Sequence, residues 1–209
     1  MDLNEDIELQ SPHEAFKKFI KISESEGWVC HRTITLPDGR TFNMYEKESD
    51  MKFPILKCVG TIKTTPTKLT DFFLNADLET RKKITPNLSL YKIIKEFEPG
   101  VHLLHYVYKA PFPVKSRDFC LKRFVHSRNS DILICGVSIV DDDLPPVKKY
   151  IRGEVLMSGY LFESISKEET QITSIIYIDP KGWIPNFVVK ASKTGELSEL
   201  TNIAKIVES

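Results

Sequence analysis

The sequence predicts an α+β fold in which a long antiparallel sheet curls around one C-terminal helix. Strand-like runs rich in Val, Ile, Tyr and Phe follow one another between residues 91 and 178, and only short turns separate them. Such short connections favour antiparallel pairing, because parallel strands need long crossovers. The chain has 209 residues and no linker rich in Gly or Ser, so we expect a single domain over residues 1–209.

The first element is predicted to be a helix that begins at Pro12. Ser11 can cap this helix, proline suits the first helical position, and Glu14 completes a capping box. After Gly27 the pattern becomes strand-like, with a Pro-Asp-Gly turn between the first two strands. The three strands predicted here are residues 28–35, 41–46 and 54–63.

Two short helices are predicted after the third strand. The first opens at Thr65-Pro66, and Asp77 caps a second, basic helix that Pro86 stops. Runs of β-branched and aromatic residues then predict a series of strands separated by turns. These six strands are residues 91–97, 102–109, 118–126, 132–140, 150–163 and 170–178.

A long helix is predicted from about Gly182 to Val207, where apolar residues recur at helical spacing. Gly195 lies within it, and a glycine weakens a helix by about 1 kcal/mol relative to alanine. We therefore expect Gly195 to be a weak point or a kink. The apolar stripe of this helix belongs either to the core or to the wall of a cavity, and patterning alone does not decide between the two.

Composition excludes several classes of protein. The 29 Lys and Arg residues balance 29 Asp and Glu residues, so we expect no nucleic-acid partner. The longest stretch without these four residue types, residues 99–108, is too short to span a membrane. Residues 1–6 read Met-Asp-Leu-Asn-Glu-Asp, an acidic stretch unlike the start of a secretory signal. The scattered cysteines favour free, buried thiols in the cytoplasm, with no metal and no cofactor; they are Cys30, Cys58, Cys120 and Cys135.

Motifs of common enzymes are missing from the sequence. It contains no Gly-x-Ser-x-Gly, no Gly-rich phosphate loop and no His-Glu-x-x-His, and its five histidines do not cluster. We therefore predict a protein that is not an enzyme. One alternative stays open, because the fold can bring Cys120 or Cys135 beside a histidine and make a nucleophile.

Three segments together form a recognisable pattern. Residues 105–119 contain Lys-Ala-Pro-Phe-Pro and then Ser-Arg-Asp-Phe, residues 150–152 read Tyr-Ile-Arg, and residues 179–185 read Asp-Pro-Lys-Gly-Trp-Ile-Pro. Their order and spacing resemble the StAR-related lipid-transfer (START) domains over essentially the whole chain. The resemblance implies a helix-grip fold, with about nine strands wrapped around the C-terminal helix. It also implies a carrier that encloses one lipid in an apolar tunnel between sheet and helix.

The resemblance is greatest to the phosphatidylcholine-transfer branch, through Lys-Ala-Pro-Phe-Pro and through residues 80–85. In the family, the position of Arg81 contacts a lipid phosphate, and Tyr106, Tyr108 and Phe119 match an aromatic cage for a quaternary ammonium. Arg123 matches an arginine of the sterol carriers. The resemblance thus implies a lipid-binding set: Arg81, Thr85, Tyr106, Tyr108, Phe119, Arg123, Leu156, Phe187 and Ala191.

Three positions depart from the family pattern. Thr85 stands where carriers of choline phospholipid or ceramide have an acid, and Leu156 replaces an aromatic or polar side chain. Tyr106 occupies the place of the acid that sterol carriers pair with their arginine. We expect a phospholipid such as phosphatidylcholine, and a sterol, ceramide or fatty acid remains an alternative ligand.

A gate is expected where the lipid enters. The C-terminal helix, with Gly195 in it, and the 110–115 loop would separate at a membrane. Phe112 and Trp183 would insert at the interface, where aromatic residues are favoured, and Lys115 would contact anionic head groups. We therefore expect a monomeric carrier that contacts membranes transiently. Two alternatives remain: a sensor that docks a partner after binding a small hydrophobic molecule, and a helix-grip hydrolase or cyclase.

Several of these residues also have ordinary structural explanations. Arg81 lies in a run of basic residues, which usually forms a solvated helix face. Two tyrosines on one strand, such as Tyr106 and Tyr108, are often plain core or cross-strand pairs. Arg117 and Asp118 are predicted to form a structural ion pair that holds the adjacent loop.

Overall fold

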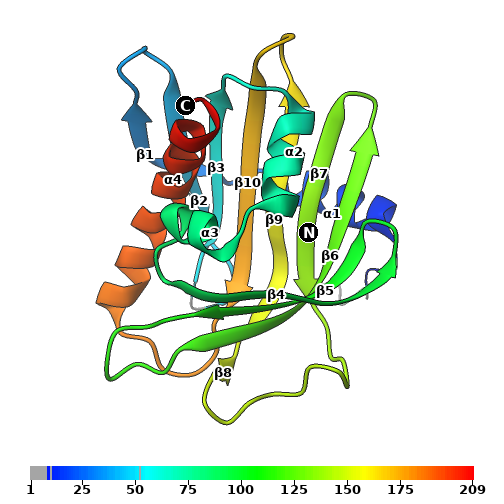
Figure 1. The fold of residues 1–209 in the computed structure, drawn as a ribbon. Helices are drawn as coiled ribbons and strands as arrows, with labels where there is room; N and C mark the ends of the chain where they lie inside the picture. The colour runs from blue at the N-terminus through cyan, green and yellow to red at the C-terminus, as the bar shows by residue number, and fades with distance from the viewer. Residues whose placement is uncertain (1–8, 10, 52) are drawn as a thin grey trace.

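The computed structural model describes residues 9, 11–51 and 53–209. Residues 1–6, the acidic stretch that argued against a secretory signal, lie outside the described residues. Figure 1 shows one long curved sheet with helices on both sides of it. The helices are α1 (Pro12–Ser23), α2 (Pro66–Asn75), α3 (Leu78–Ile84) and α4 (Asn186–Val207). The strands are β1 (Val29–Thr35), β2 (Thr41–Lys47), β3 (Ile55–Ile62), β4 (Leu88–Glu98), β5 (Val101–Tyr108), β6 (Arg117–Arg128), β7 (Asp131–Ser138), β8 (Ile151–Arg152), β9 (Glu154–Ser164) and β10 (Thr170–Asp179).

In the described part of the chain the sheet has ten strands, nine of which follow the order β1-β2-β3-β10-β9-β7-β6-β5-β4. Neighbours in this order run antiparallel, which confirms the predicted fold class. The short strand β8 pairs with β6 in parallel. One strand predicted over 150–163 is therefore two, interrupted at Gly153. A side chain at Gly153 would meet the Phe119 ring at 2.4 Å, so the backbone passes too close for any other residue.

The N-terminal helix begins as its sequence predicts. The Ser11 hydroxyl accepts a hydrogen bond from the Glu14 backbone amide at 3.2 Å, and the Glu14 carboxylate accepts one from the Ser11 amide. Helix α1 lies behind the sheet in Figure 1 and packs against β6 and β7. Its apolar side chains, Phe16 and Phe19 among them, are buried in one hydrophobic cluster with residues of these strands.

The other three helices lie in front of the sheet in Figure 1. Helix α2 packs on β7 and β9, and α4 packs on β2, β3 and α3. Side-chain caps begin α2 at Thr65 and α3 at Asp77, as predicted. A second hydrophobic cluster fills the space between these helices and the strands, and it includes Phe42, Phe162 and Leu200. This side of the sheet also holds the candidate site.

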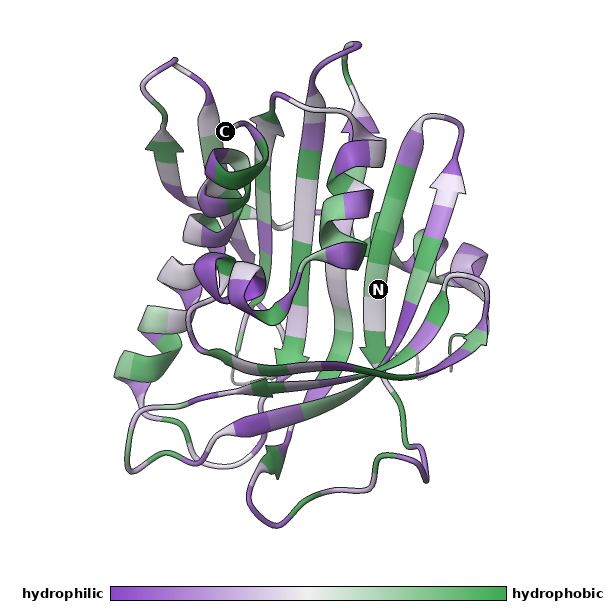
Figure 2. Cartoon of the chain, viewed as in Figure 1, coloured by the Kyte–Doolittle hydropathy of each residue, from purple (hydrophilic) through white to green (hydrophobic). Residues whose placement is uncertain are grey.

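The C-terminal helix differs from the prediction at its start. It begins at Asn186 rather than near Gly182, because Lys181 and Gly182 have positive φ angles of 50° and 65°, which are not helical. Its buried residues all lie in its second half: Leu197, Leu200, Thr201, Ile203 and Ala204. Figure 2 shows that its first turns carry hydrophobic residues too, although they project past the sheet. No helix in the described part of the chain is long and apolar enough to cross a bilayer.

The four cysteines are free thiols, as predicted. Cys58, Cys120 and Cys135 are buried, which agrees with their apolar sequence neighbours. Cys30 is exposed, contrary to the prediction, because it lies on β1 at the edge of the sheet, where nearly every residue faces solvent.

Candidate functional site

A cavity of about 140 Å³ lies between the sheet and the three helices in front of it. Its walls come from β4, β5, β6, β7 and β9 on one side and from α2, α3 and α4 on the other. Five of the predicted lipid-binding residues line it: Arg81, Thr85, Tyr106, Tyr108 and Arg123. The fold therefore brings together residues that are far apart in sequence.

Arg81 is buried at the wall of the cavity, with 8% of its surface exposed. Its guanidinium donates hydrogen bonds to the carbonyl oxygens of Phe73 and Ala76, and it stacks on the Tyr91 ring at 3.7 Å. A solvated helix face would leave this side chain in water, so that explanation does not hold. Arg81 is a fixed, buried positive charge beside the cavity.

Arg123 is a second buried arginine on the same wall, 6% exposed. Its Nη1 donates a hydrogen bond to the Tyr91 hydroxyl at 2.9 Å, so both arginines contact one tyrosine. The Arg123 Nε is buried without a hydrogen-bond partner among the residues that the structure describes. Together with Arg81 it makes a positive region that still has donor capacity.

Aromatic rings cover another part of the wall. Tyr106 and Tyr108 are stacked with ring centroids 6.1 Å apart, and the Phe119 ring meets Tyr108 edge-on at 5.8 Å. Phe119 therefore supports Tyr108 and is not part of the cavity lining. Burial raises the pKa of Tyr106 to about 12, so its hydroxyl stays neutral. Tyr160 is a further tyrosine of the wall, and sequence reasoning missed it.

An acid faces the cavity from α4, and sequence reasoning missed this residue as well. Glu199 lines the cavity and accepts a hydrogen bond from the Thr85 hydroxyl at 2.8 Å and one from the Tyr160 hydroxyl at 3.5 Å. Burial raises the pKa of Glu199 to about 7. Burial and the nearby Glu199 also raise the pKa of Glu196, one turn earlier. The sequence does contain a signal for this site: Glu196 and Glu199 are acids that interrupt the apolar stripe of α4.

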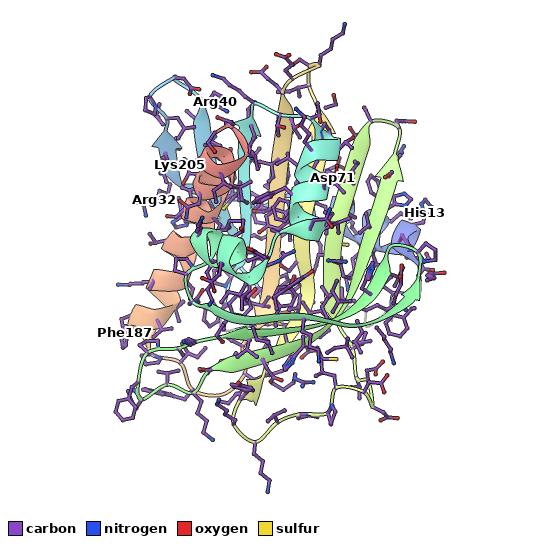
Figure 3. All side chains as sticks on the ribbon, viewed as in Figure 1. His13, Arg32, Arg40, Asp71, Phe187 and Lys205 are labelled. Carbon is purple, nitrogen blue, oxygen red and sulfur yellow. The ribbon has the colours of Figure 1, made fainter. Side chains whose placement is uncertain are left out.

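Four predicted residues do not reach the cavity wall. Phe119 packs behind Tyr108, and Leu156 is half-buried against the hydrophobic cluster that includes α1. Phe187 and Ala191 are exposed, and no residue in the first half of α4 is fully buried. Figure 3 shows Phe187 at the outer end of this helix.

The two predicted gate segments lie at the same end of the molecule. Phe112 on the 110–115 loop is 97% exposed, and Trp183 just before α4 is 66% exposed. Arg117 ties the segments together: its guanidinium donates to the carbonyl oxygens of Lys115, Lys181 and Trp183. Lys115 itself is exposed beside Phe112.

The predicted ion pair between Arg117 and Asp118 is wrong. Neighbours on a strand point to opposite faces, so the two side chains find different partners. The carboxylate of Asp118 is fully buried and contacts Arg152 at 2.8 Å and His105 at 3.1 Å. Both residues hold loops in place, so their role is structural.

Comparison with known proteins places this arrangement in a family. The START domain model matches residues 21–205. START domain-containing protein 10 of human and of mouse is 30% identical over 116 residues, which are 56% of this chain and 40% of the relative. Steroidogenic acute regulatory protein of Xenopus laevis is 26% identical over 199 residues, with 87% of this chain and 64% of the relative covered. The chain thus spans less than half of the first of these relatives.

Solved structures show the same fold. A crystal structure of human STARD10 superposes with a TM-score of 0.81 and 24% identity, covering 98% of this chain and 82% of that one. Human StAR-related lipid transfer protein 5 superposes with a TM-score of 0.80 and 17% identity, covering 94% of each chain. The match to the family model spans nearly the whole fold described above, and the chain belongs to the START domain family.

Proposed function

We propose that this domain binds one phospholipid, most readily a zwitterionic one such as phosphatidylcholine, and carries it between membranes without catalysis. The observation that carries the proposal is the cavity, which combines two buried arginines, an aromatic wall and an acid. The phosphate of such a head group would match the arginines, and its cationic nitrogen would match the aromatic wall and the acid. Human StAR-related lipid transfer protein 5, which has the same fold, is named as a lipid-transfer protein, and this supports transfer as the activity.

The phosphate is assigned to the two arginines. A guanidinium presents a planar set of donors that suits phosphate oxygens. The Nε of Arg123 is available for such a bond, since it has no partner within the described part of the chain. The cationic nitrogen is assigned to the Tyr106 and Tyr108 rings, where a cation within about 6 Å gains roughly 0.5–2 kcal/mol.

The acyl chains need more space than this conformation provides. Pockets for drug-sized ligands are about 300–1,000 Å³, and the cavity here measures about 140 Å³. Each CH₂ group taken out of water contributes about 0.8 kcal/mol, so the chains supply ample free energy for rearrangement. We propose that the first half of α4, whose Phe187 is exposed, moves to admit and then cover the chains.

Entry is assigned to the end of the molecule that carries Phe112 and Trp183. Exposed aromatic side chains of this kind insert at the boundary between head groups and acyl chains. Lys115 adds a charge that is worth about 1 kcal/mol near an anionic surface. The resulting function is that of a cytoplasmic monomer that visits membranes transiently and needs no metal or cofactor.

Catalysis by a cysteine is disfavoured. Cys135 lies at the cavity wall, but burial raises the pKa of its thiol, and burial raises the pKa of Cys120 as well. The thiolate is the reactive form of cysteine, so both thiols are held in the unreactive form.

The transfer activity is tested with labelled phosphatidylcholine moving from donor to acceptor vesicles. The wild-type protein should accelerate transfer in proportion to its concentration. Arg123→Gln should slow transfer about tenfold, because it removes a buried donor for the phosphate. Arg128→Gln is the matched control, since Arg128 lies on the same strand but is exposed. A wild-type protein that leaves the rate unchanged would refute the proposed function.

A further inference from the structure

We infer that Glu199 of α4 is the acid that selects a cationic head group in this chain, held in position by Thr85. This inference rests on the proposed function and assigns its head-group specificity. The resemblance suggested that an orienting acid is lacking, because Thr85 stands where related carriers have one. The structure instead brings a carboxylate to the same place from a different helix.

The position of Glu199 is well defined. Thr85 is the C-cap of α3, and its backbone amide donates to the Arg81 carbonyl oxygen at 2.8 Å. This geometry holds the threonine hydroxyl against one carboxylate oxygen of Glu199, at 2.8 Å. The amide of Asn202, on α4, donates to the carbonyl oxygen of Ile84 and joins the same two helices. The acid is therefore fixed at the cavity wall by α3.

The positive and negative side chains at the cavity do not form ion pairs with each other in the described part of the chain. Arg81 and Arg123 find carbonyl oxygens and Tyr91 as partners, whereas Glu199 finds two neutral hydroxyl groups. Within the described residues, no ion pair joins the acid to either arginine. Buried charges without counter-ions are costly. A ligand with both signs of charge would supply both counter-ions, whereas an anionic head group would supply only one of them.

A purely structural role for Glu199 makes a different prediction. If the residue only joins α4 to α3 through Thr85, its charge is irrelevant, because a glutamine accepts the same hydrogen bond. If Glu199 selects the head group, its negative charge is essential, and the hydrogen bond from Thr85 only positions the carboxylate. Glu199→Gln separates the two roles with almost no change of shape.

The experiment is a competition between two phospholipids with identical acyl chains. Purified protein is incubated with vesicles that contain equal amounts of phosphatidylcholine and phosphatidylglycerol, and the lipids bound to it are quantified by mass spectrometry. The wild-type protein should favour phosphatidylcholine. Glu199→Gln should lower the ratio of bound phosphatidylcholine to phosphatidylglycerol about tenfold, and Thr85→Val should lower it less. Glu79→Gln is the control, because that side chain lies on α3 but is 77% exposed, and it should keep the wild-type ratio.

Circular dichroism confirms that each variant is folded before its ratio is compared. An unchanged ratio in Glu199→Gln would overturn the inference and leave the proposed function standing. A wild-type protein that binds neither phospholipid would overturn the proposed function itself, and the inference with it. A ratio that falls equally in Glu79→Gln would show an effect of net charge alone and would also overturn the inference.

Discussion

The two halves of α4 have similar hydrophobic residues but different surroundings. Leu197 and Leu200 in the second half are almost fully buried against the sheet and α3, whereas Phe187 in the first half is 61% exposed. Lys193 lies near the end of the first half and pairs with Glu46 of β2 at 2.5 Å. The difference teaches that the second half anchors the helix to the core, whereas the first half is held mainly by this ion pair and is the part that we propose as the cover.

The largest expected effect concerns the anchor. Leu200→Ala should destabilise the protein by about 2–5 kcal/mol, because it opens a cavity in the core. Phe187→Ala in the other half should change stability by less than about 0.5 kcal/mol, since it removes an exposed side chain. Urea denaturation of both variants measures the contrast. Equal losses would contradict the division of the helix into an anchor and a cover.

The second effect is a dependence on pH. The ordinary pKa of a glutamate is 4.5, and burial raises the pKa of Glu199 to about 7. The raised value means that the folded state prefers the protonated acid, so stability from this group is full below pH 4.5 and is lost as the pH rises through about 7. The contribution of Glu199 to the stability of the lipid-free protein should therefore fall by about 2 kcal/mol between pH 5 and pH 8.

Denaturation of Glu199→Gln at both pH values tests this effect. The variant should lose less stability than the wild type. The dependence that remains includes Glu196, whose pKa is also raised, and His102 and His126, whose lowered pKa values act in the opposite direction. Thr85, Tyr160, Tyr108 and Cys58 also interact with Glu199, and the two tyrosines and the thiol stay neutral because burial raises their pKa values. An identical pH dependence in variant and wild type would show that Glu199 does not titrate in this range.

The third effect concerns the proposed gate, the end of the molecule that carries Phe112 and Trp183. Phe112→Ala together with Trp183→Ala should slow transfer between vesicles about tenfold, because interfacial insertion of two aromatic rings is lost. Stability should be unchanged, as both side chains are largely exposed. Transfer assays and thermal unfolding measure the two quantities. Normal transfer by the folded double variant would refute the assignment of this end as the gate.

The smallest effect concerns the junction of the two halves. A side chain at Gly195 would meet no atom within 4 Å, so Gly195→Ala should stabilise the protein by about 0.5–1 kcal/mol. If the helix bends there during lipid entry, the same substitution should slow transfer. A stabilised variant with wild-type transfer rates would locate the hinge elsewhere.

Local chemistry made most of the fold predictable. The caps Ser11, Thr65 and Asp77 each begin the predicted helix, because a capping side chain and its amide partner are three residues apart. Antiparallel pairing of most successive strands followed from the short turns between them. The pairing of β3 with β10 and of β7 with β9 does not, because no short turn joins those strands. The number of strands differed only at Gly153, where the chain changes partner: β8 pairs with β6, whereas β9 pairs with β7 and β10.

The site was less predictable, because it depends on register and on long-range packing. Thr85 and Glu199 meet across 114 positions of sequence, and no local pattern predicts such a contact. The pairing of β9 with β10 shifts register beside Leu156, so simple alternation does not give the orientation of that residue. The apolar stripe of α4 likewise continues through Phe187, and it does not reveal which half of the helix packs.

Native mass spectrometry of the purified protein, with fragmentation of the released ligand, tests the central claim most directly. The account predicts one bound lipid per chain and a head group that carries both a phosphate and a cationic nitrogen. A protein that is empty, and that takes up no phospholipid from mixed vesicles, would contradict it. A bound sterol or fatty acid would contradict the head-group assignment to Arg123, Tyr106 and Glu199 while keeping a lipid-binding cavity.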